Sequence, residues 1–184
     1  LAEVVVPEGV TFTSADEQLQ MFTSDKLLFR GDTSYKNVKQ LRVGGMNIIT
    51  EAASAPDYND FFWNENDGYN GSYVGTLSKD VAVTIDADKR HARYTRTTTG
   101  TKCNTTLAYD IYPTGVVDLT VTLEPCAQDL RRIGVRMNMP AAYDDVEYYA
   151  RGPWENYCDR MDGSYLQRVR TTVDDMYEVY AHPQ

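Results

Sequence analysis

The segment Asp80-Val81-Ala82-Val83-Thr84-Ile85 places a branched apolar residue at every second position. Successive side chains of a β-strand point to opposite faces of the sheet, so this spacing predicts a strand with one apolar face. Three further segments of similar character follow, at Ala92–Thr98, Thr105–Tyr112 and Val116–Leu123. Short strands separated by turn residues at this frequency predict antiparallel sheets packed as a β-sandwich.

Strand character continues on both sides of this central run. Five more short strands are predicted, at Lys26–Phe29, Val38–Val43, Met46–Thr50, Ile133–Met139 and Val146–Ala150. Turns are predicted at Arg30-Gly31-Asp32 and at Gly44-Gly45, and a helical turn only at Thr172–Tyr177, with Thr172 as its cap. We therefore predict a single all-β domain over residues 1–184.

The segment Ser54–Gly75 differs from the rest because it has no clean period. It contains Pro56 and an aromatic cluster at Phe61-Phe62-Trp63, with Tyr58 and Tyr69 around it. Long loops in compact domains are usually functional or disordered, and sugars stack their apolar faces on exposed aromatic rings. The cluster therefore has two interpretations, a sugar-contacting surface or packing anchors for the loop.

Charge and hydropathy exclude some classes of partner. The formal net charge of -9 argues against nucleic acid and anionic membrane surfaces, which require a basic face. No segment approaches the ~20 consecutive apolar residues of a membrane span. The chain begins at Leu1 without a leader pattern, and we expect it to be excised from a longer protein.

The three cysteines, Cys103, Cys126 and Cys158, have neither a CxxC pair nor a histidine at zinc spacing, so we predict no metal site in this chain. A disulfide between Cys103 and Cys126 and three free thiols both remain open.

Four blocks of the sequence resemble, in order, motifs of one known family. The most specific is Arg151–Arg160, RGPWENYCDR, which resembles the R-G-P-x-E-N-Y-x-D-R signature of the C-terminal β-sandwich of family 2 β-galactosidases. Asp175–Gln184 resembles the family's D-M-Y-x-x-Y-x-x-P-Q. Arg132–Val135 and Ala55–Asp60 resemble its R-[IV]-G strand and its A-P-x-x-N-D block. The chain departs from the family at Cys158, where proline is frequent.

The resemblance implies the small-chain domain, a supersandwich similar in fold to galactose mutarotases and truncated here on its C-terminal side. Such a truncation would leave an open strand edge, and open edges tend to pair with a second copy. The parent would hydrolyse terminal β-galactosides with retention, through two glutamates in a preceding barrel domain that also holds any magnesium and sodium. This chain would therefore carry no catalytic residue and no cofactor. Its partners would be the other domains of its own polypeptide and, through the parent, a β-galactoside or oligosaccharide, in the periplasm or the cytoplasm.

Two groups of candidate residues follow from the resemblance. The first is a loop expected to approach the active-site mouth of the barrel, formed by Asp57, Asn59, Asp60, Phe61, Phe62 and Trp63. The second is a structural motif, expected to form a mostly buried network of ion pairs and hydrogen bonds, formed by Arg151, Glu155, Asn156, Tyr157, Asp159 and Arg160. Buried charges persist in folded proteins when they are paired, and this motif supplies both signs.

Two alternative functions remain open. The chain could act as a stand-alone carbohydrate-binding or interaction module. A mutarotase would need a histidine acid and a carboxylate base on either side of a sugar ring. The sequence disfavours that role, because His91 lies in a charged run that indicates an exposed turn and His182 lies close to Gln184.

Overall fold

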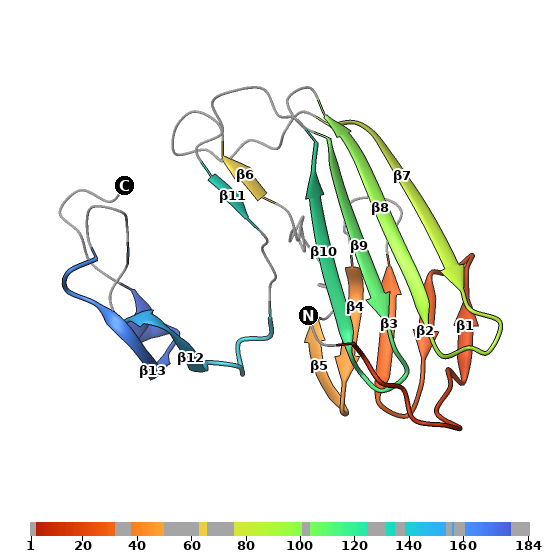
Figure 1. Ribbon diagram of the computed structural model, residues 1–184, viewed down its shortest axis with the longest axis horizontal. Coiled ribbons are helices and arrows are strands. Elements are labelled where there is room, and N and C mark those ends of the chain that lie inside the picture. The colour runs from red at the N-terminus through yellow and green to blue at the C-terminus, as the bar shows by residue number, and fades with distance from the viewer. Residues whose placement is uncertain are drawn as a thin grey trace. The chain divides into compact units, whose positions relative to one another are not determined.

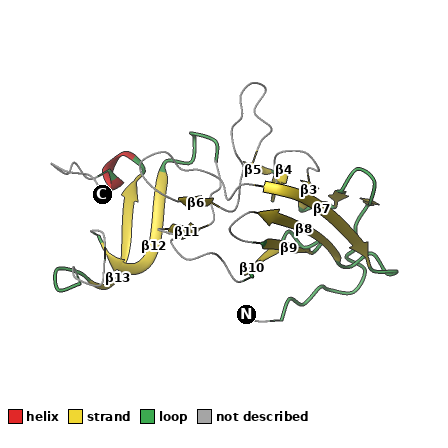
Figure 2. Ribbon diagram, turned by 90° about the horizontal axis from the view of Figure 1, so that it is seen from above, coloured by secondary structure: helices red, strands yellow, loops and turns green. Residues whose placement is uncertain are grey.

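The computed structural model of the chain describes residues 3–31, 38–49, 63–65, 76–100, 104–124, 132–134, 139–153, 156 and 161–177. The chain divides into two compact units, residues 1–139 and 140–184, and each is described by itself. Strands dominate both units, and the one helical element in the described part is the short 3-10 helix η1 (Asp174–Met176) (Figure 2). The all-β prediction is therefore confirmed, whereas a single domain over residues 1–184 stays a prediction. No helix in the described residues is long and apolar enough to cross a membrane.

The first sheet of unit 1 has five antiparallel strands in sequence order. They are β1 (Ser14–Asp16), β2 (Met21–Thr23), β3 (Leu27–Gly31), β4 (Val38–Val43) and β5 (Met46–Ile49). The β4–β5 hairpin turns at Gly44 and Gly45, whose φ angles are 57° and 85°. Positive φ at both central positions is typical of a type I′ hairpin turn, which glycine adopts without strain. The predicted break at this pair is confirmed.

The second sheet of unit 1 is an antiparallel meander with the order β10-β9-β8-β7. Its strands are β7 (Thr76–Ile85), β8 (Ala92–Gly100), β9 (Thr105–Ile111) and β10 (Val117–Leu123). The four segments predicted from the alternating run at 80–123 are all confirmed as strands. In register, Val83 lies opposite Tyr94, Tyr94 opposite Tyr109, and Tyr109 opposite Leu119.

The two sheets of unit 1 lie face to face, with β7–β10 in front of β1–β5 in Figure 1. Aromatic rings fill the space between them. The Phe29 ring of the first sheet lies 5.7 Å from that of Tyr94 and 5.6 Å from that of Tyr109, measured between ring centroids. Residues from both sheets form one core cluster: Phe12, Phe22, Leu27, Phe29, Val38, Ile49, Ala92, Tyr94, Leu107, Tyr109 and Ile111. This shared core makes unit 1 a β-sandwich.

Two short pairs of strands complete the described structure. In unit 1, β6 (Trp63–Glu65) pairs antiparallel with β11 (Arg132–Gly134). In unit 2, β12 (Asp145–Gly152) pairs antiparallel with β13 (Tyr165–Thr172), and this two-stranded ribbon contributes no residue to the core cluster. The chain then enters η1, where the Asp175 backbone N–H donates to Thr172 Oγ1 at 3.2 Å. The N-cap position itself is Val173, one residue after the predicted Thr172, whose hydroxyl nevertheless accepts this bond.

The structure corrects several predicted boundaries. Trp63–Glu65 is a strand inside the segment predicted to be loop, because it finds a partner in β11 about 70 residues away, which local sequence does not reveal. Met139 is not part of a strand. The strand β13 was not expected because its half-buried face carries Gln167, Val169 and Thr171, of which only Val169 is apolar.

The predicted turn at Arg30-Gly31 is wrong, because both residues belong to β3. The buried Tyr94 ring packs directly over Gly31, and a Cβ atom at Gly31 would lie 2.5 Å from Tyr94 Cε2. The glycine here marks a close approach between the sheets. A shift in register between Arg30 and Gly31 accompanies it.

We predict that Gly31→Ala lowers the free energy of unfolding by about 1–3 kcal/mol, because the added methyl group overpacks the core against Tyr94. Urea denaturation followed by circular dichroism measures this. Gly163→Ala is the control, since nothing lies within 4 Å of a Cβ atom there. Equal stability of Gly31→Ala and the unmodified chain would contradict the tight packing.

Candidate functional site

The loop expected to approach a substrate ends at β6. Asp57, Asn59, Asp60, Phe61 and Phe62 lie outside the described residues. Trp63 is the first residue of β6, and its backbone pairs with that of Gly134 in β11. The segment that follows the Ala55–Asp60 block therefore pairs with the block that begins at Arg132 in one short ladder.

The signature segment begins at the end of β12 and turns back toward β13. Arg151 Nη1 donates to the Ser164 carbonyl at 2.9 Å, and Asn156 Nδ2 donates to the Arg151 carbonyl at 2.9 Å. The Ser164 hydroxyl, which is buried, donates to Asn156 Oδ1. Gln167 Nε2 donates to the Gly152 carbonyl at 2.8 Å. These bonds tie the segment to both strands of the ribbon.

The observed network differs in part from the expected buried ion pairs. Arg151 is exposed, and its described partner is a backbone carbonyl rather than a carboxylate. Burial was therefore the wrong expectation for this residue. Ser164 and Gln167 were not among the predicted residues, because they lie outside the signature. Glu155, Tyr157, Asp159 and Arg160 lie outside the described residues, and their part of the network stays a prediction.

An exposed charge cluster lies on the same ribbon, where Glu147 lies opposite Arg170 in the β12–β13 ladder. Arg168 Nε donates to Glu147 Oε1 at 2.8 Å, and Arg170 Nε donates to Glu147 Oε2 at 2.5 Å. The hydrogen bonds from Arg170 and Arg168 hold the pKa of Glu147 below its usual value. A carboxylate held in this way is suited to an ion pair and not to general acid catalysis.

A second polar cluster surrounds His91. The sequence predicted an exposed side chain in a turn, but the His91 side chain is only 27% exposed and is paired with a carboxylate. Its Nε2 lies 2.9 Å from Asp110 Oδ1, and its Nδ1 lies 3.4 Å from Asp86 Oδ2. Arg93 Nη1 also contacts Asp110 Oδ1, at 3.2 Å. Because His91 bonds Asp110 directly, the pair leaves no space between them for the sugar ring that a mutarotase must hold. His182 lies outside the described residues.

Tyr112 packs on this cluster, with its ring centroid 5.2 Å from that of His91. Burial, followed by the negative charges of Asp110 and Asp118, raises the pKa of Tyr112. These effects all disfavour a phenolate, so Tyr112 stays protonated. The cluster links the β7–β8 turn to β9 as a structural element.

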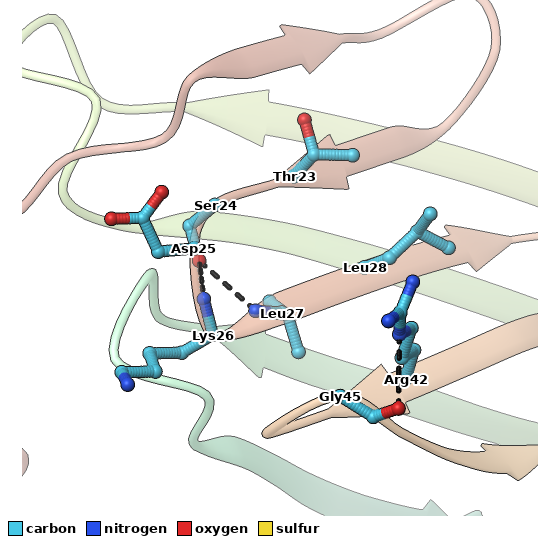
Figure 3. Close-up of a pocket in the computed structure, with 8 residues that line it drawn as sticks. All are labelled: Thr23, Ser24, Asp25, Lys26, Leu27, Leu28, Arg42 and Gly45. Carbon is cyan, nitrogen blue, oxygen red and sulfur yellow. Dashed lines mark hydrogen bonds between the residues drawn. The ribbon is translucent and has the colours of Figure 1, made fainter.

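A small cavity of about 210 Å³ lies between the turn after β2 and the β4–β5 hairpin (Figure 3). Its lining includes the charged residues Asp25, Lys26 and Arg42. Arg42 Nε donates to the Gly45 carbonyl at 3.2 Å, and Ser24 Oγ accepts from the Lys26 and Leu27 backbone N–H groups. In Figure 3 the three charged groups point in different directions, so they do not converge on a common ligand atom.

In the described part of the chain, no group of three or more histidine, cysteine, aspartate or glutamate residues is arranged to hold a metal ion. Cys103, Cys126 and Cys158 lie outside that part, and the disulfide question stays open.

Comparison with known proteins gives one consistent relationship. The sequence model of a family described as beta galactosidase small chain matches residues 25–184. A β-galactosidase of Vibrio cholerae serotype O1 is 31% identical over 112 residues, covering 60% of this chain and 10% of that protein. β-Galactosidases of Staphylococcus xylosus and Priestia megaterium are 33% and 32% identical over 81 and 80 residues, each covering 8% of the relative. The chain thus spans about a tenth or less of the length of these relatives.

We predict that Asn156→Ala accelerates amide hydrogen exchange in β12 and β13. The substitution removes the bond to the Arg151 carbonyl and one partner of the buried Ser164 hydroxyl, which costs about 1–3 kcal/mol. Exchange should rise in the ribbon and remain unchanged in β7–β10. Asn47→Ala, at an exposed position of β5, is the control. Unchanged protection of the ribbon would show that the side chain of Asn156 does not stabilise it.

We predict that the Glu147 carboxyl titrates below 4.5, its ordinary value, when it is followed by NMR. Since its folded-state pKa is lowered, its contribution to stability is present above the unfolded value and is lost as pH falls through the folded value. Arg170→Gln should move the titration upward more than Arg168→Gln, because the Arg170 hydrogen bond has the larger effect. A midpoint that neither substitution moves would contradict the cluster.

Proposed function

Because the chain belongs to the β-galactosidase small-chain family, we propose that it is a non-catalytic β-sandwich domain of a longer β-galactosidase that hydrolyses terminal β-galactosides. The observation that carries the proposal is the family match over residues 25–184. In this proposal the domain supports the catalytic barrel and contributes one loop to the mouth of the active site. Other domains of the same polypeptide are then its direct partners.

The chemistry of the described carboxylates supports a non-catalytic role. A retaining glycosidase needs two carboxyl groups about 5–5.5 Å apart, one of which must act as a general acid. A general acid requires a raised pKa, whereas the pKa of Glu147 is lowered by Arg170 and Arg168. Asp110 is occupied by His91 and Arg93. We therefore assign the acid and the nucleophile to the barrel domain of the parent, together with any magnesium and sodium.

The loop Asp57–Trp63 is the proposed contribution to substrate binding. Asp57, Asn59 and Asp60 can accept or donate hydrogen bonds to sugar hydroxyls, and the aromatic residues that follow can stack on apolar sugar faces. The β6–β11 ladder supports this role because it pairs the backbone at the end of the loop with a strand of the sandwich unit. A site anchored on a strand keeps its geometry better than one on a free loop.

The second candidate function is a stand-alone carbohydrate-binding or interaction module. The two are separated by assaying the natural-length protein and the 184-residue chain with a chromogenic β-galactoside. The proposal expects that the natural-length protein turns over the substrate and that the 184-residue chain does not. It also expects the sequence of the natural-length protein to contain a barrel domain with two catalytic glutamates. A module would bind sugar as the 184-residue chain and require no such barrel.

We predict that Trp63→Ala in the natural-length protein lowers kcat/KM by about tenfold or more, a loss of about 1.4 kcal/mol of transition-state stabilisation. The thermal unfolding midpoint should stay unchanged. Tyr149→Ala, which removes an exposed aromatic residue from β12, is the control and should retain full activity.

Two results would overturn parts of this proposal. If Trp63→Ala leaves kcat/KM unchanged, the loop serves packing and the domain is a scaffold. If the 184-residue chain itself turns over the substrate and Glu155→Gln abolishes that turnover, the chain is an enzyme in its own right.

A further inference from the structure

The strand β10 lies at the edge of its sheet. It ends the order β10-β9-β8-β7, and within the described residues no strand pairs with its outer side. The strand is seven residues long, from Val117 to Leu123, and regular along its whole length (Figure 1). An edge of this kind presents a row of unpaired backbone groups that another strand can bind.

The hydrogen bonds to the β9 side identify which backbone groups face outward. The Tyr112 N–H donates to the Val116 carbonyl, and the Glu124 N–H donates to the Asn104 carbonyl, both at 3.0 Å. Even-numbered residues of this segment therefore direct their backbone groups toward β9, and alternation directs those of the odd-numbered residues outward. The residues whose backbone N–H and C=O groups point away from β9 are Val117, Leu119, Val121 and Leu123.

We propose that the open edge of β10 pairs antiparallel with β10 of a second copy of this chain, about a two-fold axis at Thr120. This register sets Thr120 opposite itself and Leu119 opposite Val121 of the second copy. At the ends it sets Asp118 opposite Thr122 and Val117 opposite Leu123.

Self-complementarity of the sequence carries this proposal. Every apolar residue of the strand meets an apolar residue, at positions whose backbone groups face outward and can form the new hydrogen bonds. Every polar residue meets a polar one, and no like charges lie opposite each other, which would destabilise the pair. The pairing is isologous, as a two-fold dimer requires.

The two faces of β10, one apolar and one polar, also match those of the second copy. Val117, Leu119 and Val121 pack against the core cluster but remain partly exposed, so a neighbouring strand would extend the apolar interior over them. Thr120 and Thr122 are exposed on the opposite face. A perpendicular two-fold axis keeps the two faces in register, so the apolar sides of both copies face the same way.

The other edge of this sheet is less suited to self-pairing. The strand β7 carries Lys79 and Asp80 near its middle. A two-fold axis at Asp80 would place two aspartates opposite each other, and an axis at Val81 would place Lys79 opposite Val83. Central charges protect an edge strand from pairing, whereas the single charge of β10 lies near one end.

Two lysine substitutions on the same face of β10 test the register in the 184-residue chain. Sedimentation equilibrium should show a monomer–dimer equilibrium for the unmodified chain. Thr120→Lys places two ammonium groups opposite each other at the axis and should raise the dimer dissociation constant roughly tenfold or more. Thr122→Lys places an ammonium opposite Asp118 of the second copy and should not raise it. Circular dichroism melting shows whether both variants remain folded.

Cysteine cross-linking provides the second measurement, in a background with Cys103, Cys126 and Cys158 replaced by serine. Thr120 would occupy a non-hydrogen-bonded site, where Cα atoms lie about 4.5 Å apart and within disulfide reach. Thr120→Cys should form a covalent dimer on oxidation, and Thr122→Cys should not. A monomer at all concentrations, equal weakening by both lysine variants, or a dimer that Thr120→Cys fails to cross-link would each overturn the proposal.

Discussion

The contact between Phe29 and the two tyrosines Tyr94 and Tyr109 joins the sheets of unit 1, and the remaining features of the sandwich depend on it. All three side chains are buried, and their rings meet in tilted pairs. Such pairs stabilise the fold beyond the contribution of the apolar area that they bury. Rings of this size set how closely the sheets approach. Gly31 lies where this approach leaves no space for a side chain, because the Tyr94 ring occupies the position of a Cβ atom.

The sequence predicts the second sheet well because its signal is local. Val81, Val83 and Ile85 alternate in a single window, and turns such as Pro113-Thr114-Gly115 lie between consecutive strands. Arg96 shows the limit of this reasoning. It occupies an inward position of β8 next to Tyr94 and is buried, although its residue type predicts the solvent side. Its placement depends on tertiary surroundings that alternation does not encode.

The candidate site was predictable to a smaller extent. The resemblance points to the loop that ends at Trp63 and to the block Arg132–Val135 separately, but the pairing of Trp63 with Gly134 is a long-range contact that only the folded chain reveals. Asn156 was predicted to stabilise the signature segment, and it does form a network, although through Ser164 and backbone carbonyls instead of ion pairs. The involvement of His91 with Asp86 and Asp110 was missed because two of these residues flank one turn and the third lies on a different strand.

The β12–β13 ribbon should open and close more often than the sandwich of unit 1. Every residue of the core cluster lies between Phe12 and Ile111, so the described part of the ribbon is held by its ladder, its surface ion pairs and the Asn156 bonds. Isolated two-stranded ribbons are marginally stable in water. Thermal fluctuations should therefore open the ribbon far more often than the sandwich, because little buried apolar area is lost when it opens. When the polypeptide folds, the sandwich should therefore become stable first and the β12–β13 ladder afterwards.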